Sequence, residues 1–507
     1  MRSQNMKIME TPVSQSNLSR STRCSQIKRI VFQSSPWLFL TLGVLVRIFH
    51  YLNNRSLWQD EAKLALNILD KSFYELLYPL DYNQGAPVLF LWLEKICVTL
   101  FGPSELALRF LPFLSSFIGL VIFYKIAKQL FDNKFLLLSL FLFVFSYQLV
   151  YYSHEVKQYS FDVTVSLTLI YLVIRFQPFE RPRIRTFFLL SMAGGIALWL
   201  SHASLFILPG IGILFALRCF QERSNTSLIG LTMVTIFWLL NFVVLYSISL
   251  KSLEGNRFML AFWQRGFIPP PTSLQNVEII LRRLIQFINY SGFSHNWLYL
   301  VVLLFLIGSI EMIVSKRSES LVLLLPFCFT LVASSLHKYA FINRLVLFLV
   351  PFFYIFIVYG LFVFGRKKKS YVVVILIFLT MVPFIKTGFK LTTPITREEV
   401  RPLLAHLMLN RKGNDIVYVS AVLWPVVKYY HRRMSFDYED WIRVESPGKN
   451  PSQWNEVINS VSKHPRVWFL ISHIPSDDEA HLLSDIYGNR NEEIHLDGAS
   501  LYFFSFE

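Results

Sequence analysis

The stretch SSPWLFLTLGVLVRIFHYLNNRSLWQDEA, residues 34–62, joins a long apolar run to an acidic pair. Residues 34–52 are apolar over enough length to cross a bilayer as a helix. The carboxylates of Asp60 and Glu61 follow this run closely, and ionisable side chains at a membrane face usually carry a function. The sequence therefore predicts a membrane protein whose chemistry is centred on Asp60.

Similar apolar runs recur along the chain as far as residue 388. Of the 507 residues, 54% are hydrophobic and 16% are charged, which is typical of a chain that lies mostly in lipid. We therefore predict an α-helical polytopic membrane protein with about eleven transmembrane helices. They are expected at 34–52, 106–126, 134–152, 160–176, 186–201, 203–219, 228–249, 297–315, 319–336, 344–364 and 370–388.

The net charge of +16 does not indicate a nucleic-acid-binding protein, because Lys and Arg fall mainly in short loops between apolar runs. Residues 1–33 are polar and basic and are predicted to form a disordered cytoplasmic tail. No small-residue cleavage site follows residues 34–52, so we expect this helix to be retained. The positive-inside pattern then sends residues 53–83 and a long loop, 250–296, to the outer side.

The segment 86–101 allows two topologies. It is short, begins near Pro87 and carries two charges near its middle, which is unusual for a transmembrane helix. If it crossed the membrane, the basic clusters at 175–185 and 366–369 would move to the outer side. The positive-inside argument favours a helix lying on the surface, so residues 53–104 are predicted to form an outer loop with interfacial helices.

Beyond residue 390 the apolar runs shorten and charged residues return, so residues 391–507 are predicted to form a small soluble α/β domain on the outer side. Strands are expected at 415–420 and 466–472, and helices near 398–409, 424–431 and 477–487. The cysteines show no CxxC spacing, and no disulfide framework or zinc site is predicted for Cys24, Cys97, Cys219 and Cys328.

The acidic pair has two interpretations. A carboxylate at the membrane face can deprotonate an acceptor hydroxyl or amine, or hold a divalent cation. Alternatively, Asp60 is the N-cap and Glu61 a first-turn residue of an amphipathic helix whose apolar positions run from Ala62 to Phe73.

A second polar segment, YYSHEVKQYS at 151–160, lies between two apolar runs. Its short length must place Glu155 and Lys157 at the membrane face, where they pair with each other or bind anions. The alternative is a Lys that extends to the surface beside interfacial rings such as Tyr159.

A third segment, SLHKYAFINR at 335–344, contains Lys338 and ends in Arg344. A guanidinium there suits bidentate contact with a phosphate, although an anchor to lipid head groups is the alternative. His202 is a weaker candidate, because a helix-end His commonly makes one structural hydrogen bond. All these residues are expected on one side of the membrane, where a pocket open to lipid and solvent suits an amphiphilic phosphorylated lipid.

On these residues the chain resembles the GT-C membrane glycosyltransferases, specifically the bacterial RgtA/B/C/D-like branch related to protein O-mannosyltransferases and aminoarabinose transferases. The resemblance covers about residues 34 to 365 and rests on the order of its motifs as well as on their residues. These are the pair Asp60 and Glu61, the helix from Pro87 to Gly102, the span opening Leu108 to Pro112, the loop with Tyr152, Ser153, Glu155 and Tyr159, and the late Arg344.

The resemblance implies a glycosyltransferase that takes a hexosyl or pentosyl unit from a polyprenyl-phosphate donor and inverts the anomeric centre. Asp60 would be the base or the carboxylate that orients the acceptor, while Lys157 and Arg344 would hold the donor phosphate. Glu61 and Glu155 would orient these groups or, with Asp60, bind Mg²⁺ or Mn²⁺ where a metal is used. The expected substrate-binding set also includes Gln84, Tyr159, His202 and Lys338.

Three positions depart from the family pattern. The family often has Arg where this chain has Lys157, which keeps the charge but loses the bidentate fork. It often has Lys or His before a Pro pair where this chain has Gln84-Gly85-Ala86-Pro87, and Arg-Tyr where this chain has Arg344-Leu345. The contacts to the donor are therefore expected to differ more than the central carboxylate.

The expected location is the plasma membrane, with the active site and the C-terminal domain outside. Expected partners are membrane lipids, a polyprenyl-phosphate-linked sugar and a lipid, glycan or protein acceptor, and no nucleic acid. One rival interpretation is a transporter or flippase of lipid-linked sugars, although such proteins often show internal repeats and midplane charges, and neither is evident in this sequence. The other is a non-catalytic protein of envelope assembly, whose function would not depend on Asp60.

Overall fold

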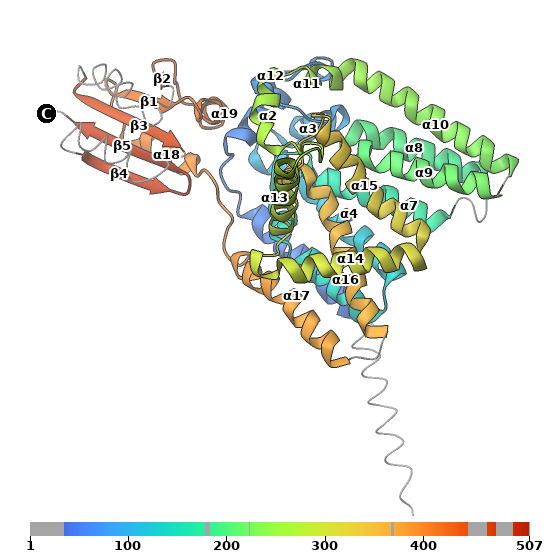
Figure 1. Cartoon of the computed structure of the whole chain (residues 1–507). Helices are drawn as coiled ribbons and strands as arrows, with labels where there is room; N and C mark the ends of the chain where they lie inside the picture. The colour runs from blue at the N-terminus through green and yellow to red at the C-terminus, as the bar shows by residue number, and fades with distance from the viewer. Residues whose placement is uncertain are drawn as a thin grey trace, which may run out of the picture.

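The computed structural model describes residues 35–177, 183–222, 224–366, 370–444, 464–472 and 490–505. The predicted N-terminal tail, 1–33, and the predicted helix at 477–487 lie outside the described residues. The rest forms a helical bundle with a small sheet domain at the C-terminal end of the chain (Figure 1).

Within the described residues, eight helical segments are long and apolar enough to cross a membrane, which confirms a polytopic α-helical protein. They match eight of the eleven predicted spans. They consist of the helix Ser35–Leu52, α4 (Glu105–Leu130), α7 (Tyr159–Phe176), α9 (Ser204–Glu222), α10 (Asn225–Leu245) with its extension to Glu254, α14 (Leu298–Ser315), α15 (Arg317–Ser335) and η7 (Asn343–Leu349) with α16 (Val350–Arg366).

The other three predicted spans differ from the expectation. The span predicted at 134–152 is broken into α5 (Asn133–Val144) and α6 (Tyr147–Tyr151), which meet at an angle of 54°. The prediction of one continuous helix was therefore wrong: Ser146 adopts an extended backbone at the break, and a new helix starts after it. The helices α8 (Ile184–Leu200) and α17 (Ser370–Lys390) cover the remaining two positions but are not among the eight.

The bundle core is held by close contact between apolar helices. Gly308 of α14 and Gly360 of α16 let the two backbones touch, since a Cβ on Gly308 would lie 1.9 Å from the carbonyl oxygen of Phe356. Small residues at such crossings are the usual way for membrane helices to pack. Ser104 is the N-cap residue of α4, and its hydroxyl accepts a hydrogen bond from the Ala107 amide.

The segments 53–104 and 250–296 both contain helices, which were predicted only for 53–104. Residues 53–104 contain α2 (Gln59–Asp70) and α3 (Val88–Phe101), and α3 has 14 residues. At about 1.5 Å per residue it is roughly 21 Å long, short of a hydrocarbon core about 30 Å thick, which agrees with an interfacial helix. The segment 250–296, predicted as a loop, contains α11 (Lys251–Glu254), α12 (Arg257–Phe262) and the amphipathic α13 (Leu274–Tyr290).

The C-terminal domain has a five-stranded sheet in the order β2-β1-β3-β5-β4. The strands β1 (Ile416–Ser420) and β3 (Arg466–Ser472) and the helices α18 (Val400–Asn410) and α19 (Trp424–Met434) confirm four predicted elements. The strands β2 (Ile442–Val444), β4 (Arg490–Leu496) and β5 (Ala499–Ser505) were not predicted. β1 pairs with β2 and β3 in parallel, and β5 pairs antiparallel with β3 and β4.

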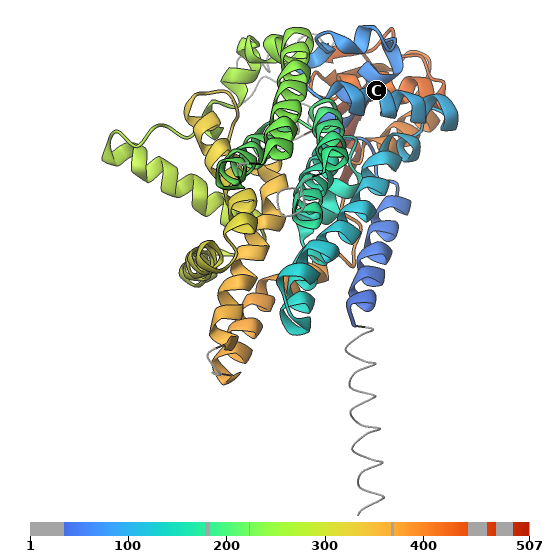
Figure 2. The ribbon, with the colours of Figure 1, turned by 90° about the vertical axis from the view of Figure 1, so that its right-hand side faces the viewer.

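The helices α2, α3, α11 and α12 lie at one end of the bundle, and the C-terminal domain packs at the same end (Figures 1 and 2). A hydrophobic core joins them: buried residues of α2, such as Ala62 and Leu66, pack in one cluster with Val400, Leu404 and Val427 of the C-terminal domain. The acidic pair at the start of α2 therefore lies between the helical bundle and the C-terminal domain.

Candidate active site

The first turn of α2 separates its two carboxylates. Trp58 is the N-cap residue, so the prediction that Asp60 caps this helix was wrong. Asp60 and Glu61 are instead both first-turn residues, and successive positions on a helix point in directions about 100° apart. The two side chains therefore enter different surroundings.

Asp60 is held between two cations from distant parts of the chain. The Lys157 Nζ atom lies 3.1 Å from Asp60 Oδ1, and Arg344 Nη2 lies 2.8 Å from Asp60 Oδ2. Lys157 Nζ also donates a hydrogen bond of 2.5 Å to Gln84 Oε1. The structure thus brings together four of the predicted site residues. The side chain of Asp60 remains 15% exposed, so solvent reaches it.

Aromatic rings surround the guanidinium of Arg344. Its central carbon lies 5.6 Å from the ring centre of Trp58, 5.7 Å from Tyr159 and 5.5 Å from Trp263. Rings at this distance attract a cation and restrict where it can move. We call Asp60, Gln84, Lys157, Tyr159 and Arg344 the Asp60 cluster.

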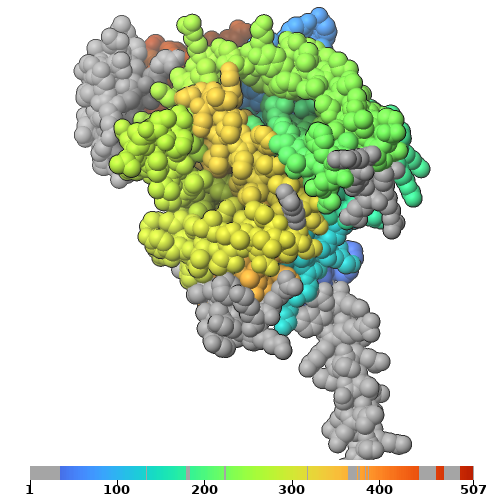
Figure 3. Space-filling model, turned by 45° about the vertical axis from the view of Figure 1, so that its right-hand side comes forward, coloured from blue at the N-terminus to red at the C-terminus, as the bar shows by residue number. Residues whose placement is uncertain are grey.

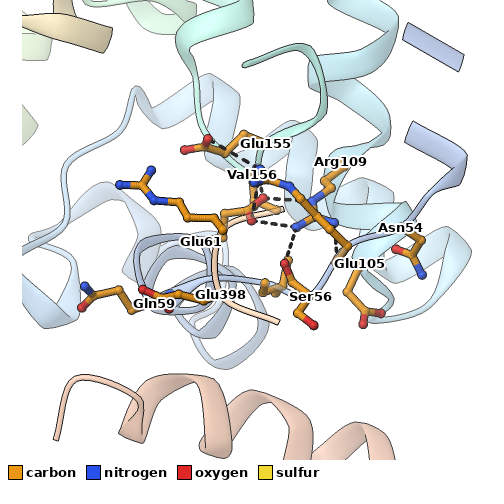
Figure 4. A network of polar contacts seen from close by, with 12 residues as sticks. Asn54, Ser56, Gln59, Glu61, Glu105, Arg109, Glu155, Val156 and Glu398 are labelled. Carbon is orange, nitrogen blue, oxygen red and sulfur yellow. Dashed lines mark hydrogen bonds and ion pairs between the residues drawn. The ribbon is translucent and has the colours of Figure 1, made fainter. Parts of the chain in front are cut away.

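Glu61 is fully buried in a separate network of ion pairs. Arg109 donates to both of its carboxylate oxygens, from Nε at 2.9 Å and from Nη2 at 2.7 Å. The Val156 amide donates to the same carboxylate at 2.8 Å, and Figure 4 shows Glu61 between Arg109 and the segment of Glu155 and Val156. Arg109 also donates to the carbonyl oxygens of Arg55 and Ser56. Glu61 therefore ties α2 to the 151–160 segment.

Glu155 lies beside this network and has weaker partners. Its Oε2 atom lies 3.7 Å from Arg55 Nη2, and neither carboxylate oxygen accepts a hydrogen bond from a described residue. Arg55 itself donates to the Tyr151 hydroxyl at 3.0 Å. Burial and the neighbouring Glu61 carboxylate raise the pKa of Glu155.

The cations also set the protonation of Asp60. Burial alone would raise its pKa, but Lys157 and Arg344 outweigh burial and hold the pKa of Asp60 well below its usual range. Burial lowers the pKa of Lys157, and the Asp60 carboxylate opposes part of that shift. Asp60 is therefore an anion in the free protein at neutral pH.

Besides Glu61 and Glu155, two further predicted site residues lie outside the Asp60 cluster. Lys338 is half exposed and pairs with Glu254. His202 makes no hydrogen bond or ion pair with a member of the cluster in the described part of the chain, and burial lowers its pKa to about 4. Their positions in the sequence predicted the same end of the molecule as Asp60. Lying at the same end does not by itself place a side chain in contact with Asp60.

A divalent cation fits these residues poorly. Among the described residues, no three His, Cys, Asp or Glu side chains converge so that they could hold a metal ion. The carboxylate of Glu61 is engaged by Arg109, and that of Asp60 by two cations. Both carboxylates are therefore already paired with cations of the protein itself.

Sequence reasoning missed the residues that support the acidic pair. Arg55, Trp58, Arg109 and Arg397 all contact the acidic pair or the residues around it. A signal existed for Arg109, because an Arg inside an apolar run usually has a buried partner. Arg397 carries no such signal, since it lies in a polar segment at the start of the C-terminal domain and meets Trp58 only in the folded chain.

The space-filling surface is hollowed on one side of the bundle. Figure 3 shows this hollow between green helices and a yellow-orange segment, with blue atoms from the N-terminal part of the chain on its floor.

Comparisons with known proteins agree with this architecture. Residues 85–246 match the family model described as dolichyl-phosphate-mannose-protein mannosyltransferase. The undecaprenyl phosphate-alpha-4-amino-4-deoxy-L-arabinose arabinosyl transferase of Wigglesworthia glossinidia brevipalpis is 25% identical over 218 residues, which is 41% of this chain. That alignment spans only 38% of the relative's length.

Two solved structures share the fold at low sequence identity. ArnT from Cupriavidus metallidurans, bound to undecaprenyl phosphate, has a TM-score of 0.50 and 12% identity, over 92% of this chain and 97% of its own. The oligosaccharyltransferase of Archaeoglobus fulgidus in the apo form has a TM-score of 0.51 and 11% identity, over 86% of this chain and 69% of its own. The chain therefore shares its fold with ArnT and with an oligosaccharyltransferase, and residues 85–246 are similar in sequence to the dolichyl-phosphate-mannose-protein mannosyltransferase family.

Proposed function

We propose that the protein is a membrane glycosyltransferase that moves a sugar from a polyprenyl-phosphate-linked donor to an acceptor, with inversion and with Asp60 as base. The observation that carries this proposal is the position of Asp60 between Lys157 and Arg344 at one end of an apolar helical bundle. A carboxylate and two cations within contact distance supply a proton acceptor and a site for an anionic leaving group.

The reaction is a single displacement at the anomeric carbon. The acceptor oxygen or nitrogen forms a bond to that carbon while the bond from the carbon to the phosphate oxygen breaks, so the configuration inverts. The proton of the acceptor passes to Asp60, and the electron pair of the broken bond leaves with the phosphate. Lys157 and Arg344 stabilise the negative charge that develops on that phosphate.

The donor phosphate and Asp60 compete for the same cations. In the free protein both cations contact Asp60, which makes it a weak base because its pKa is held well below the usual range. A phosphate that takes over one or both cations releases the carboxylate and raises its basicity. Donor binding therefore prepares Asp60 to accept a proton.

The names of the relatives support the donor class. One matched family acts with dolichyl-phosphate-mannose, and ArnT from Cupriavidus metallidurans was solved with undecaprenyl phosphate bound. Both lipids are polyprenyl phosphates, and we infer that the donor of this protein belongs to the same class. The sugar is a hexosyl or pentosyl unit, and the acceptor is a lipid, a glycan or a protein.

The test is transfer of a labelled sugar from polyprenyl-phosphate donors by the full chain purified into lipid nanodiscs. We expect turnover in the wild type and a loss of at least about 100-fold in Asp60→Asn, the range for removal of a general base. Asp70→Asn is the matched control, because Asp70 ends the same helix and pairs with Arg432 of the C-terminal domain. Movement of lipid-linked sugar across vesicles without donor consumption would instead support the flippase.

We also propose that the Asp60 cluster and the C-terminal domain lie on the outer side of the plasma membrane. The supporting observation is that the polar end of the bundle carries both, with the basic N-terminal tail preceding the first span. A membrane-impermeant maleimide on intact cells should label Ser72→Cys, just after α2, and leave Arg183→Cys, before α8, unlabelled. The reverse pattern would invert this topology.

A further inference from the structure

We propose that the C-terminal domain is a working part of the active site, because its segment Thr396–Arg401 positions the start of α2 and so the carboxylate of Asp60. Glu398 is the positioning residue in this segment. The inference rests on the proposed function for the role of Asp60, but the contacts that carry it are independent of that role.

Glu398 caps the helix that bears Asp60. A helix leaves its first amide groups without partners inside the helix, and the N-cap residue commonly satisfies one of them. Here the N-cap residue Trp58 makes no side-chain cap. The Gln59 amide donates instead to Glu398 Oε2 at 2.8 Å, and Figure 4 shows Glu398 beside Gln59. A carboxylate at this helix end also opposes the positive end of the helix dipole.

The residues before the cap are fixed by the same domain. Glu399 accepts hydrogen bonds from the amide and the hydroxyl of Ser56, the latter at 2.8 Å. The Leu57 amide donates to the Tyr430 hydroxyl of α19 at 2.9 Å. Arg401 donates to the carbonyl oxygen of Asn54 at 2.7 Å. The backbone leading into α2 is therefore hydrogen-bonded to side chains that come more than 300 residues later in the chain.

Arg397 connects the segment to the Asp60 cluster through Trp58. The guanidinium of Arg397 lies 3.4 Å from the ring centre of Trp58, and that of Arg344 lies 5.6 Å from the same centre. One indole therefore contacts an arginine of the C-terminal domain and the arginine that pairs with Asp60.

The sheet holds the segment from its other side. The Glu399 amide donates to the Asp497 carbonyl oxygen at 2.9 Å, and Thr396 bonds to the Asp497 side chain. The turn between β4 and β5 needs Gly498, which has φ +69° and whose Cβ would lie 1.9 Å from the Arg397 carbonyl oxygen. The β4–β5 hairpin therefore helps to fix the segment that caps α2.

The chemical consequence follows from the geometry of the first helical turn. Gln59 is adjacent to Asp60, so a loss of the cap frays the turn that aims Asp60 at Lys157 and Arg344. A displacement of 1 Å at a reacting group can lower a rate by about 100-fold. A domain that lies outside the bundle can in this way set the activity of a site at the end of the bundle.

The test is hydrogen exchange of the full chain in nanodiscs, read on peptides that cover residues 54–66. Glu398→Ala should accelerate exchange at 57–61 by about fivefold, the expected effect of a lost helix cap. Glu398→Gln keeps an acceptor oxygen and should restore protection. Glu439→Ala, an exposed carboxylate of the same domain, is the control and should not change exchange there.

In the transfer assay, Glu398→Ala should lower kcat, with KM for the donor changed by less than twofold, and Glu398→Gln should recover most of kcat. Unchanged exchange at 57–61 in Glu398→Ala, or an equal rise in Glu439→Ala, would overturn the proposal. Faster exchange with normal kcat would refute the positioning role. Exchange requires no turnover, so a wild type that fails to transfer sugar contradicts the proposed function while exchange still decides whether the cap exists.

Discussion

Asp60→Asn should bind polyprenyl phosphate more tightly than the wild type while losing transfer. In the free protein Asp60 contacts both cations that the phosphate is proposed to use, at 3.1 Å and 2.8 Å. A phosphate must therefore displace a carboxylate before it can bind. Asparagine has no charge. Its carbonyl oxygen can face only one of the two cations, and its NH₂ group repels the other. Both cations therefore become available to the phosphate.

The size of the effect follows from what the phosphate displaces. A hydrogen bond to a charged group contributes about 1.5 to 3 kcal/mol net, which corresponds to roughly 10- to 100-fold in affinity. Asp60 is 15% exposed, and solvent weakens its attraction to the cations, so we expect the lower end, about tenfold. A change of this size is well within the resolution of a direct binding measurement.

The assay is isothermal titration calorimetry, in which a short-chain polyprenyl phosphate is added to detergent-solubilised wild type, Asp60→Asn and Asp70→Asn. Asp70→Asn should bind as the wild type does, because Asp70 lies at the other end of α2 and its partners, Lys428 and Arg432, are not in the Asp60 cluster. Equal or weaker binding by Asp60→Asn would refute the reasoning, since it would mean that the phosphate does not use Lys157 and Arg344.

Three further results are expected. Glu61→Gln should lower the free energy of unfolding by about 3 to 5 kcal/mol in thermal denaturation, because it breaks a fully buried ion pair, and a normal melting temperature would contradict that. The pKa of Asp60 is lower in the folded than in the unfolded chain, so its stabilising effect is lost when the pH falls. The difference in melting temperature between wild type and Asp60→Asn should therefore be constant from about pH 5 to 8 and shrink below about pH 4. A difference that stays constant down to about pH 3 would exclude this linkage. Lys157→Met should weaken polyprenyl-phosphate binding by about 100-fold and Lys338→Met by less than twofold in the same titration, and equal losses would place Lys338 in the donor site.

The parts of the site that the sequence predicts are those with a local signal. Asp60, Lys157 and Arg344 each stand out as charged residues beside long apolar runs, and the structure brings them into contact. His202 and Lys338 carry the same local signal, but within the described part of the chain neither makes a hydrogen bond or ion pair with the Asp60 cluster. A position at the end of an apolar run predicts how deep in the membrane a residue lies. It does not predict which residues at the same depth are its neighbours.

Long-range partners account for most of what was missed. The bond between Gln59 and Glu398 joins residues 339 positions apart, and no local pattern indicates it. The break at Ser146 also has a distant partner, since the Tyr354 hydroxyl donates to the Ser146 hydroxyl at 3.0 Å. Apolar length predicts where a helix lies, while its interruptions depend on which helices pack around it.

The contacts between residues 54–59 and the C-terminal domain also determine when the site can form during synthesis. Closing a loop of about 340 residues has an entropy cost of roughly 5 kcal/mol, which the later contacts must offset. Residues beyond 390 take roughly 5 to 25 s to synthesise after the last predicted span, at about 5 to 20 residues per second. During that interval the helices are already made, but Gln59 has no cap and Ser56 has no acceptor from Glu399. A chain stopped near residue 390 would therefore have its helices inserted but would lack the contacts that hold the start of α2, and the Asp60 carboxylate would be positioned only after residues 396–401 and 430 have been made.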